Sequence, residues 1–369
     1  MDPPVDQSIA NALSILQDIG ALTPQEELTE LGEKFGHLPV HPLISKMLFF
    51  AVLVNCLDPA LTLACAADYK EPFTMPMSPV ERQKAAAAKL ELASLCGGDS
   101  DHLAVVAAFE CWKNAKGRGL SAEFCSQYFV SPSAMKMLDQ MRSQLESELK
   151  RHGIIPNDIS SCSQNSRDPG ILRAVLAVGL YPMVGRLCPA FGNNRRTIVE
   201  TASGAKVRVH SLSNNFNLSS KKYDESLLVF DEITRGDGGM HIRNCTVARD
   251  LPLLLISTEI AVAPTGSSDS DDSNEEEEDD EEVAANTNEE VAANTNEEGM
   301  DIHKEESRRG AKMMSSPENS VKLVVDRWLP FRTTALEVAQ MYILRERLMA
   351  SILFKVSLES IMLKTTPYF

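Results

Sequence analysis

The sequence has no closely spaced cysteine pair and no long apolar run, and these absences exclude several classes of protein. None of the eight cysteines forms a Cys-x-x-Cys pair, which fits reduced, mostly buried thiols better than a disulfide framework or a zinc site. The apolar runs 47–54 and 251–256 are far shorter than the ~20 residues that span a bilayer. The first residues also lack the charged and apolar regions of a signal peptide. We expect an intracellular chain, in the nucleus or the cytoplasm, with no membrane partner.

The patterns of common enzyme sites are missing as well. The sequence contains no G-x-x-x-x-G-K-[ST] phosphate loop, no G-x-S-x-G elbow and no H-E-x-x-H pair, and its seven histidines show no metal-ligand spacing. The strand-like run 226–231 ends at the pair Asp231-Glu232, whose second residue directly follows it, and such a pair presents carboxylates to Mg²⁺ in helicases. Without a phosphate loop this pair cannot organise Mg·ATP, so we interpret it as a strand end. We predict no catalytic residue, no metal ligand and no cofactor-binding residue in this chain.

Positive charge is in short supply. The chain has 36 Lys and Arg against 52 Asp and Glu, and the net charge of −16 counts against nucleic-acid binding. Fifteen of the acids, however, lie between Asp269 and Glu298, where no Lys or Arg occurs, and without them the charge is −1. This segment repeats one octapeptide at 281–288 and 289–296. We predict that 263–320 is a disordered acidic insertion, either inert or, less favoured, masking a basic patch by imitating nucleic acid.

Apolar spacing predicts a helical first half. Three short helices are expected within residues 1–54, ended at Gly20, at Gly36 and near 54, as in a helix-turn-helix or winged-helix module. Ala- and Leu-rich segments at 59–67, 79–95, 102–112 and 131–152 predict further helices, followed by a polar linker at 158–168. In the last of these helices we expect an apolar stripe to pack against its neighbours, with four basic residues outside it. The stripe is Met135, Leu138, Met141, Leu145 and Leu149, and the basic residues are Lys136, Arg142, Lys150 and Arg151.

The second half changes to short β-like runs. After a helix at 171–180, runs at 197–200, 205–210, 226–231, 241–247 and 253–257 predict a small barrel or sandwich. A further strand is expected at 321–328. Thr334 and Glu337 have the spacing of a capping box and predict a final helix. The expected fold class is therefore a multidomain α+β protein.

A basic strand face is the strongest candidate for function. Alternation in 205–210 places Lys206, Arg208 and His210 on one face and Val207 and Val209 toward the core. Small barrels bind single strands by combining such a groove with aromatic stacking platforms. An ordinary solvated strand face explains the pattern equally well. Other basic residues flank or follow this strand, namely Arg195, Arg196, Lys221, Lys222, Arg235 and Arg243, and the candidate platforms are Phe216, Tyr223 and His241.

Several motifs also recur in the order of a known family. They are Asn11-Ala12-Leu13, Leu28-Thr29-Glu30-Leu31-Gly32, Leu38-Pro39-Val40-His41-Pro42, Gly97-Gly98-Asp99-Ser100-Asp101-His102-Leu103, Cys111-Trp112, Gly179-Leu180-Tyr181-Pro182, Val209-His210-Ser211-Leu212-Ser213-Asn214 and Val325-Asp326-Arg327-Trp328. In this order the chain resembles the C-terminal accessory half of DEAH/DExH-box RNA helicases, most of all the maleless/RNA-helicase-A-like branch. Ser211 stands where that family has a proline.

The resemblance implies a domain order. It implies a winged helix at 1–46, a helical helicase-associated (ratchet) domain at 47–157, a linker at 158–170 and the first part of an OB-fold at 171–262. After the insertion at 263–320, the closing strand of the OB-fold and a C-terminal helix are expected at 321–369.

The resemblance also implies a function. We expect an RNA-binding accessory module that contacts single-stranded or structured RNA and works with RecA-like motor domains in cis or in trans. ATP and Mg would act only through those motor domains, so the chain is interpreted as a fragment, a truncated gene model or a natural short product. The alternatives are a scaffold for helicase cofactors and an ATP-dependent RNA helicase with an unrecognised ATP site. The predicted RNA-binding residues are Arg195, Arg196, Lys206, Arg208, His210, Ser213, Lys221, Lys222 and Arg243.

Overall fold

The computed structural model describes residues 4–67, 69, 71–188, 197–218, 226–236, 239–257, 259–264 and 317–365. The chain divides into two compact units, Met1–Thr258 with Leu344–Phe369, and Glu259–Ile343. The predicted insertion at 263–320 falls largely outside the described residues. None of the helices in the described part of the chain is long and apolar enough to cross a membrane.

Three short helices open the first unit, as predicted. They are α1 (Asp6–Asp18), α2 (Glu30–Gly36) and α3 (Pro42–Leu53). Gly20 follows α1 with a φ of +75°, and the Thr29 hydroxyl caps α2 by accepting from the Gly32 amide at 2.9 Å. Their shared core contains Phe35, Phe49 and, from the last helix of the chain, Ile352.

A bundle of five helices follows. It contains α4 (Leu57–Ala67), α5 (Pro79–Leu95), α6 (Asp101–Gly117), α7 (Ser121–Gln127) and α8 (Pro132–Arg151). Met135, Leu138, Leu145 and Leu149 are buried, and Met141 is half-buried, so the predicted packing stripe of α8 is confirmed. Arg142, which was expected outside that stripe, is only 7% exposed.

The polar segment predicted as a linker is packed into the structure. It forms the 3₁₀ helix η1 (Ile159–Cys162), which contacts α3 and α4. The next helix, α9 (Pro169–Leu180), lies directly against α3. A Cβ atom on Gly179 would lie 2.4 Å from Cβ of Met47, so this close approach requires glycine.

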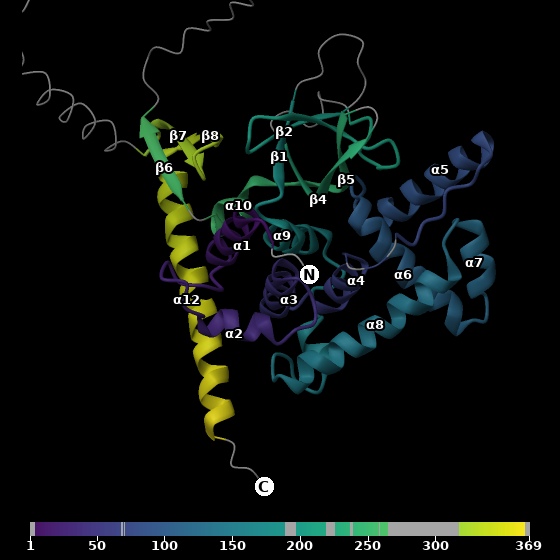
Figure 1. The fold of residues 1–369 in the computed structure, drawn as a ribbon, viewed down its shortest axis with the longest axis horizontal. Coiled ribbons are helices and arrows are strands. Elements are labelled where there is room, and N and C mark those ends of the chain that lie inside the picture. The colour runs from purple at the N-terminus through teal and green to yellow at the C-terminus, as the bar shows by residue number, and fades with distance from the viewer. Residues whose placement is uncertain are drawn as a thin grey trace, which may run out of the picture. The chain divides into compact units, whose positions relative to one another are not determined.

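A closed five-stranded barrel follows α9 in the first unit (Figure 1). Its strands are β1 (Val184–Leu187), β2 (Ile198–Thr201), β3 (Lys206–Val209), β4 (Leu227–Gly236) and β5 (Gly239–Ala248), in the order β1-β2-β3-β5-β4. Strands β3 and β5 pair in parallel and the other pairs are antiparallel. The barrel core is built from Val199, Val207, Val209, Leu228, Phe230, Ile242 and Cys245. The predicted fold class, helical domains before a small barrel, is confirmed.

In the barrel region, two strand assignments differ from the prediction. The prediction of a strand at 253–257 is wrong, because residues 253–256 belong to helix α10 (Asp250–Ile256). A short leucine run does not distinguish a strand from a helix by periodicity alone. The fifth barrel strand is instead β1, which the sequence analysis missed because Gly185 and Arg186 interrupt its apolar pattern.

The second unit contains a separate antiparallel sheet. It is formed by β6 (Ile260–Pro264), β7 (Ser320–Val325) and β8 (Leu329–Thr334), and it leads into helix α12 (Ala335–Thr365). The structure thus places β7, expected to close the OB-fold, in this sheet, because β1 already closes the barrel by pairing with β4. The capping box is confirmed: the Glu337 amide donates to Thr334 Oγ1 at 3.3 Å, and the Glu337 carboxylate accepts from the Thr334 amide at 3.1 Å.

Candidate nucleic-acid interface

Strand β3 presents its basic residues outward. Lys206 and Arg208 are exposed, whereas Val207 and Val209 are each only 1% exposed. The predicted alternation is therefore confirmed for the strand itself. His210 follows directly after β3 and is half-buried.

The neighbouring strands extend this face. Arg208 is paired in register with His241 of β5, and Arg243, two residues further along β5, is exposed opposite Glu232 of β4. Carboxylates interrupt the face on its other side, where Lys206 lies opposite Glu200. Lys206 and Arg243 thus lie opposite acidic residues, so the described barrel strands do not form a uniformly basic sheet.

Two histidines add aromatic surface next to the cations. The rings of His210 and His241 meet edge to face with their centroids 6.1 Å apart. Burial, followed by the charge of Arg243 and the proximity of His241, lowers the pKa of His210. Its imidazole is therefore neutral at pH 7 and can offer a ring for stacking or a hydrogen bond, but it adds no positive charge.

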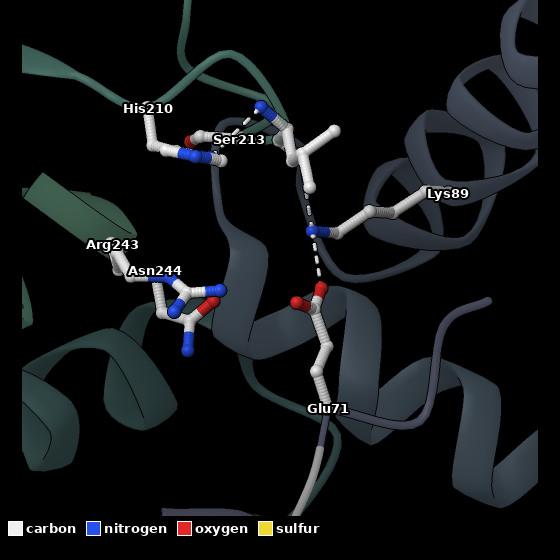
Figure 2. Close-up of a pocket in the computed structure, with 7 residues that line it drawn as sticks. Glu71, Lys89, His210, Ser213, Arg243 and Asn244 are labelled. Carbon is white, nitrogen blue, oxygen red and sulfur yellow. Dashed lines mark hydrogen bonds and ion pairs between the residues drawn. The ribbon is translucent and has the colours of Figure 1, made fainter. Parts of the chain in front are cut away.

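A small pocket opens between this face and the helical bundle (Figure 2). On the barrel side His210, Ser213 and Arg243 line it, and on the helical side Glu71 and Lys89. Lys89 Nζ lies 3.0 Å from Glu71 Oε1 and 3.2 Å from Asp101 Oδ1, and it donates to the Leu212 carbonyl oxygen at 3.3 Å. The charge of Lys89 is thus balanced internally.

Asp101, at the start of α6, reaches across to the barrel. Its carboxylate accepts from the Ser213 hydroxyl, from the Asn214 amide at 2.9 Å and from the Cys245 amide at 3.1 Å. Burial opposes the charge of Asp101, but Lys89 and these three donors outweigh it and lower the pKa of the carboxyl. The Ser213 hydroxyl, predicted to contact RNA, donates here to a carboxylate of the same chain.

His102 forms a second bridge to the barrel. Its Nε2 lies 2.8 Å from Asp231 Oδ1, and its Nδ1 lies 2.8 Å from the Thr246 hydroxyl oxygen. The interpretation of Asp231 as a strand end is wrong, because β4 continues to Gly236. Its carboxylate holds an imidazole of the helical bundle.

The remaining predicted residues divide into two groups. Phe216 is half-buried beside β2, where its carbonyl accepts from the Thr197 amide at 2.9 Å. Arg195, Arg196, Lys221 and Lys222, together with Tyr223, lie outside the described residues. Within the described ranges no group of three or more His, Cys, Asp or Glu residues could hold a metal ion.

Sequence reasoning missed Asp101 and Lys89 as parts of this region. Asp101 and His102 stood in the motif Ser100-Asp101-His102-Leu103, which contributed only to the family resemblance. That motif was the available signal. The buried salt bridge between Lys89 of α5 and Asp101 of α6 joins two different helices and leaves no pattern within either one, so no local signal indicated Lys89.

Three protein families match consecutive parts of this chain. Residues 12–40 match the winged-helix part of the helicase associated domain (HA2), and residues 41–105 match its ratchet-like part. Residues 172–260, which include the whole barrel, match an oligonucleotide/oligosaccharide-binding (OB) fold. The fold is thus a helicase-associated winged-helix and ratchet region followed by an OB-fold.

Relatives of this chain carry the same region within longer proteins. The chain is 99% identical over 357 residues to the DExH-box ATP-dependent RNA helicase DExH6 of Arabidopsis thaliana, covering 97% of this chain and 28% of that helicase. It is 65% identical to DExH2 of the same plant, over 96% of this chain and 22% of the relative. The human ATP-dependent DNA/RNA helicase DHX36 is 34% identical over 71% of this chain and 26% of its own length. The chain therefore corresponds to the helicase-associated region of a DExH-box RNA helicase and spans about a quarter of each relative's length.

Proposed function

We propose that this chain is the RNA-binding accessory region of a DExH-type RNA helicase, which supports unwinding together with RecA-like motor domains in cis or in trans. The observation that carries the proposal is the outward placement of Lys206 and Arg208 on a barrel of the OB family, beside Arg243 on the adjoining strand. Motor domains would supply the ATP and Mg chemistry, and we expect the region to act inside the cell. Membership of the maleless-like branch stays a prediction.

The arrangement suits a single strand better than a duplex. Lys206 and Arg208 are two residues apart on β3, and Arg243 lies on β5, which pairs with β3. These three cations therefore form a short patch. Such a patch contacts a few phosphates, and the rings of His210 and His241 offer stacking surfaces beside it. We infer modest, salt-sensitive binding that does not depend strongly on base sequence.

Reversing the charge of the β3 patch tests this proposal. We expect Lys206→Glu combined with Arg208→Glu to weaken filter binding of a single-stranded RNA 20-mer about tenfold or more in low salt. Losing two phosphate contacts should also flatten the log–log salt dependence by roughly 1.4, at about 0.7 per contact for single strands.

A matched control separates this local effect from a change in net charge. Lys113 and Arg118 are exposed residues at the end of α6, outside the barrel, and their reversal to Glu changes the net charge equally. This control should retain RNA affinity within about twofold, the level of a net-charge effect at a distance. Unchanged binding by the β3 variant, or equal losses in both variants, contradicts the proposed interface.

A scaffold that binds helicase cofactors is the second candidate. The exposed apolar residues of α12 favour it, because Leu353 is 63% and Phe354 66% exposed, and such side chains often mark protein contacts. If the purified chain shows no RNA affinity at low salt, the scaffold is preferred. RNA-stimulated ATP hydrolysis by the purified chain would contradict both readings and indicate a complete helicase.

A further inference from the structure

We propose that Asp101 is a positioning residue for RNA binding: from the helical bundle it fixes the barrel loop 210–214 and the middle of β5, and through them His210 and Arg243. The inference rests on the proposed function, because Asp101 would position residues of the same RNA-binding face. Asp101 itself would make no contact with RNA. It acts through the backbone that carries the contacting side chains.

The two oxygens of Asp101 are fully used by donors. Oδ1 accepts from the Asn214 amide at 2.9 Å and lies 3.2 Å from Lys89 Nζ, while Oδ2 accepts from the Ser213 hydroxyl and from the Cys245 amide at 3.1 Å. Cys245 is two residues from Arg243 on β5, and Asn214 follows the loop that begins at His210. One carboxylate therefore ties together the two segments that hold these side chains.

The loop depends on such outside partners. Its internal backbone bonds are few, with the Ser213 amide donating to His210 at 3.0 Å and the Phe216 amide donating to Ser213 at 3.2 Å. Lys89 supports the loop through the Leu212 carbonyl, and the side-chain amide of Asn215 donates to the carbonyl oxygens of Asp99 and Cys245 at 3.2 and 2.9 Å. The helical bundle thus supplies much of the loop's order.

Water cannot easily replace Asp101. The residue is 2% exposed, so donors released by its loss remain buried and unsatisfied. An asparagine at this position keeps only one acceptor oxygen, and its NH₂ group would face donors of the barrel or of Lys89. We call the contacts of the Asp101 carboxylate with Ser213, Asn214 and Cys245 the Asp101 clamp. Asp101→Asn therefore disrupts this clamp while leaving the side-chain volume almost unchanged.

The experiment uses the full chain and a fluorescent uridine 20-mer. We expect Asp101→Asn to weaken binding about tenfold, equivalent to ~1.4 kcal/mol. In the same variant, hydrogen exchange at the Asn214 and Cys245 amides should accelerate, while the amides pairing β1 with β2 keep their protection. A loss of RNA affinity without this local change in exchange, or faster exchange with unchanged affinity, overturns the proposal.

Asp58→Asn is the matched control. It breaks the ion pair between Asp58 of α4 and Arg142 of α8, which involves no residue of the barrel. We expect the control to lower thermal stability but to keep RNA affinity within about twofold, because no barrel contact is lost. Equal loss of RNA affinity in both variants would show general destabilisation and contradict a positioning role.

Two further variants, Ser213→Ala and Arg243→Ala, test the positioning role of Asp101 separately from RNA binding by the β3 patch. If Asp101→Asn does not fold, Ser213→Ala removes one donor to the Asp101 carboxylate and should weaken binding about threefold or more, because the loop loses one charge-assisted hydrogen bond. In an Arg243→Ala background the effect of Asp101→Asn should shrink, because the clamp then has less to position. Additive losses overturn the inference, whereas failure of the Lys206 and Arg208 reversal to weaken binding overturns the proposed function.

Discussion

Arg142 is a charged side chain inside the helical bundle, and its partners explain why the chain tolerates it there. Its guanidinium donates to the backbone and side-chain oxygens of Asp58 and to the Thr62 hydroxyl. Its centre also lies 4.8 Å from the ring centroid of Phe109. The flat, forked guanidinium makes all these contacts together, which a lysine ammonium does not.

We expect Arg142→Lys to lower the free energy of unfolding by ~2 kcal/mol, because at least one buried acceptor loses its donor. Urea unfolding followed by circular dichroism measures the change. Arg151→Lys is the control, since Arg151 pairs with Glu148 on the same helix and its side chain is 68% exposed. The control should stay within ~0.5 kcal/mol of the parent. Equal losses would show that the guanidinium fork of Arg142 has no special role.

Most of the helices were predictable from the sequence because their ends carry local signals, although α10 was predicted as a strand. Thr29 caps α2, Asp168 caps α9, and the Thr334–Glu337 box opens α12, each through bonds to residues two or three positions away. The barrel depends on pairing between distant residues, so β1 was missed and its closure against β4 was not foreseen.

The candidate site follows the same division. The alternation that exposes Lys206 and Arg208 is local and was predicted. The clamp by Asp101 joins residues more than a hundred positions apart, and no pattern within a single strand or helix indicates it. The same applies to Arg142. Its position outside the apolar stripe of α8 did not indicate that it would be buried against Asp58 of α4.

Strand β1 approaches β2 so closely that glycine is required at its second position. A Cβ atom on Gly185 would lie 2.4 Å from Val199 Cγ1 and 2.9 Å from the Glu200 carbonyl oxygen. We expect Gly185→Ala to destabilise the barrel by ~2–3 kcal/mol, as overpacking in a well-packed core does. Hydrogen exchange of the β1–β2 amides measures the local part of this loss.

Gly117→Ala is the natural comparison. Gly117 ends α6, and nothing lies within 4 Å of the position that a Cβ atom would occupy. Alanine there should be neutral or stabilise the protein by up to ~1 kcal/mol through its higher helix propensity. A Gly185→Ala variant as stable as the parent would mean that β1 and β2 pack less tightly than the structure indicates.

The charge of the whole chain describes one segment more than it describes the folded body. Fifteen carboxylates between Asp269 and Glu298 account for nearly all of the −16. On the described barrel strands Lys206 lies opposite Glu200, and Arg243 lies opposite Glu232. The net charge is therefore no argument against RNA binding by the barrel. The charged residues that connect the helical bundle to the barrel, such as the pair of His102 and Asp231, have a more direct effect on the folded body.

His102 and His210 should give this chain two opposite responses to pH. Burial lowers the pKa of His102, but the charge of Asp231 outweighs burial, and the pKa is raised overall. The ion pair with Asp231 is therefore fully stabilising below about pH 6.5, the pKa of histidine in the unfolded chain. This stabilisation is lost as the pH rises through the raised pKa of the folded state. Burial and Arg243 lower the pKa of His210, so that residue costs stability as pH falls below about 6.5. Urea unfolding at pH 5.5 and pH 9 should show a larger stability deficit at pH 5.5 for His102→Gln. For His210→Gln the change relative to the parent should be more favourable at pH 5.5 than at pH 9. A His102→Gln deficit that is equal at both pH values would show that its bridge to the barrel does not depend on the charge of the imidazole.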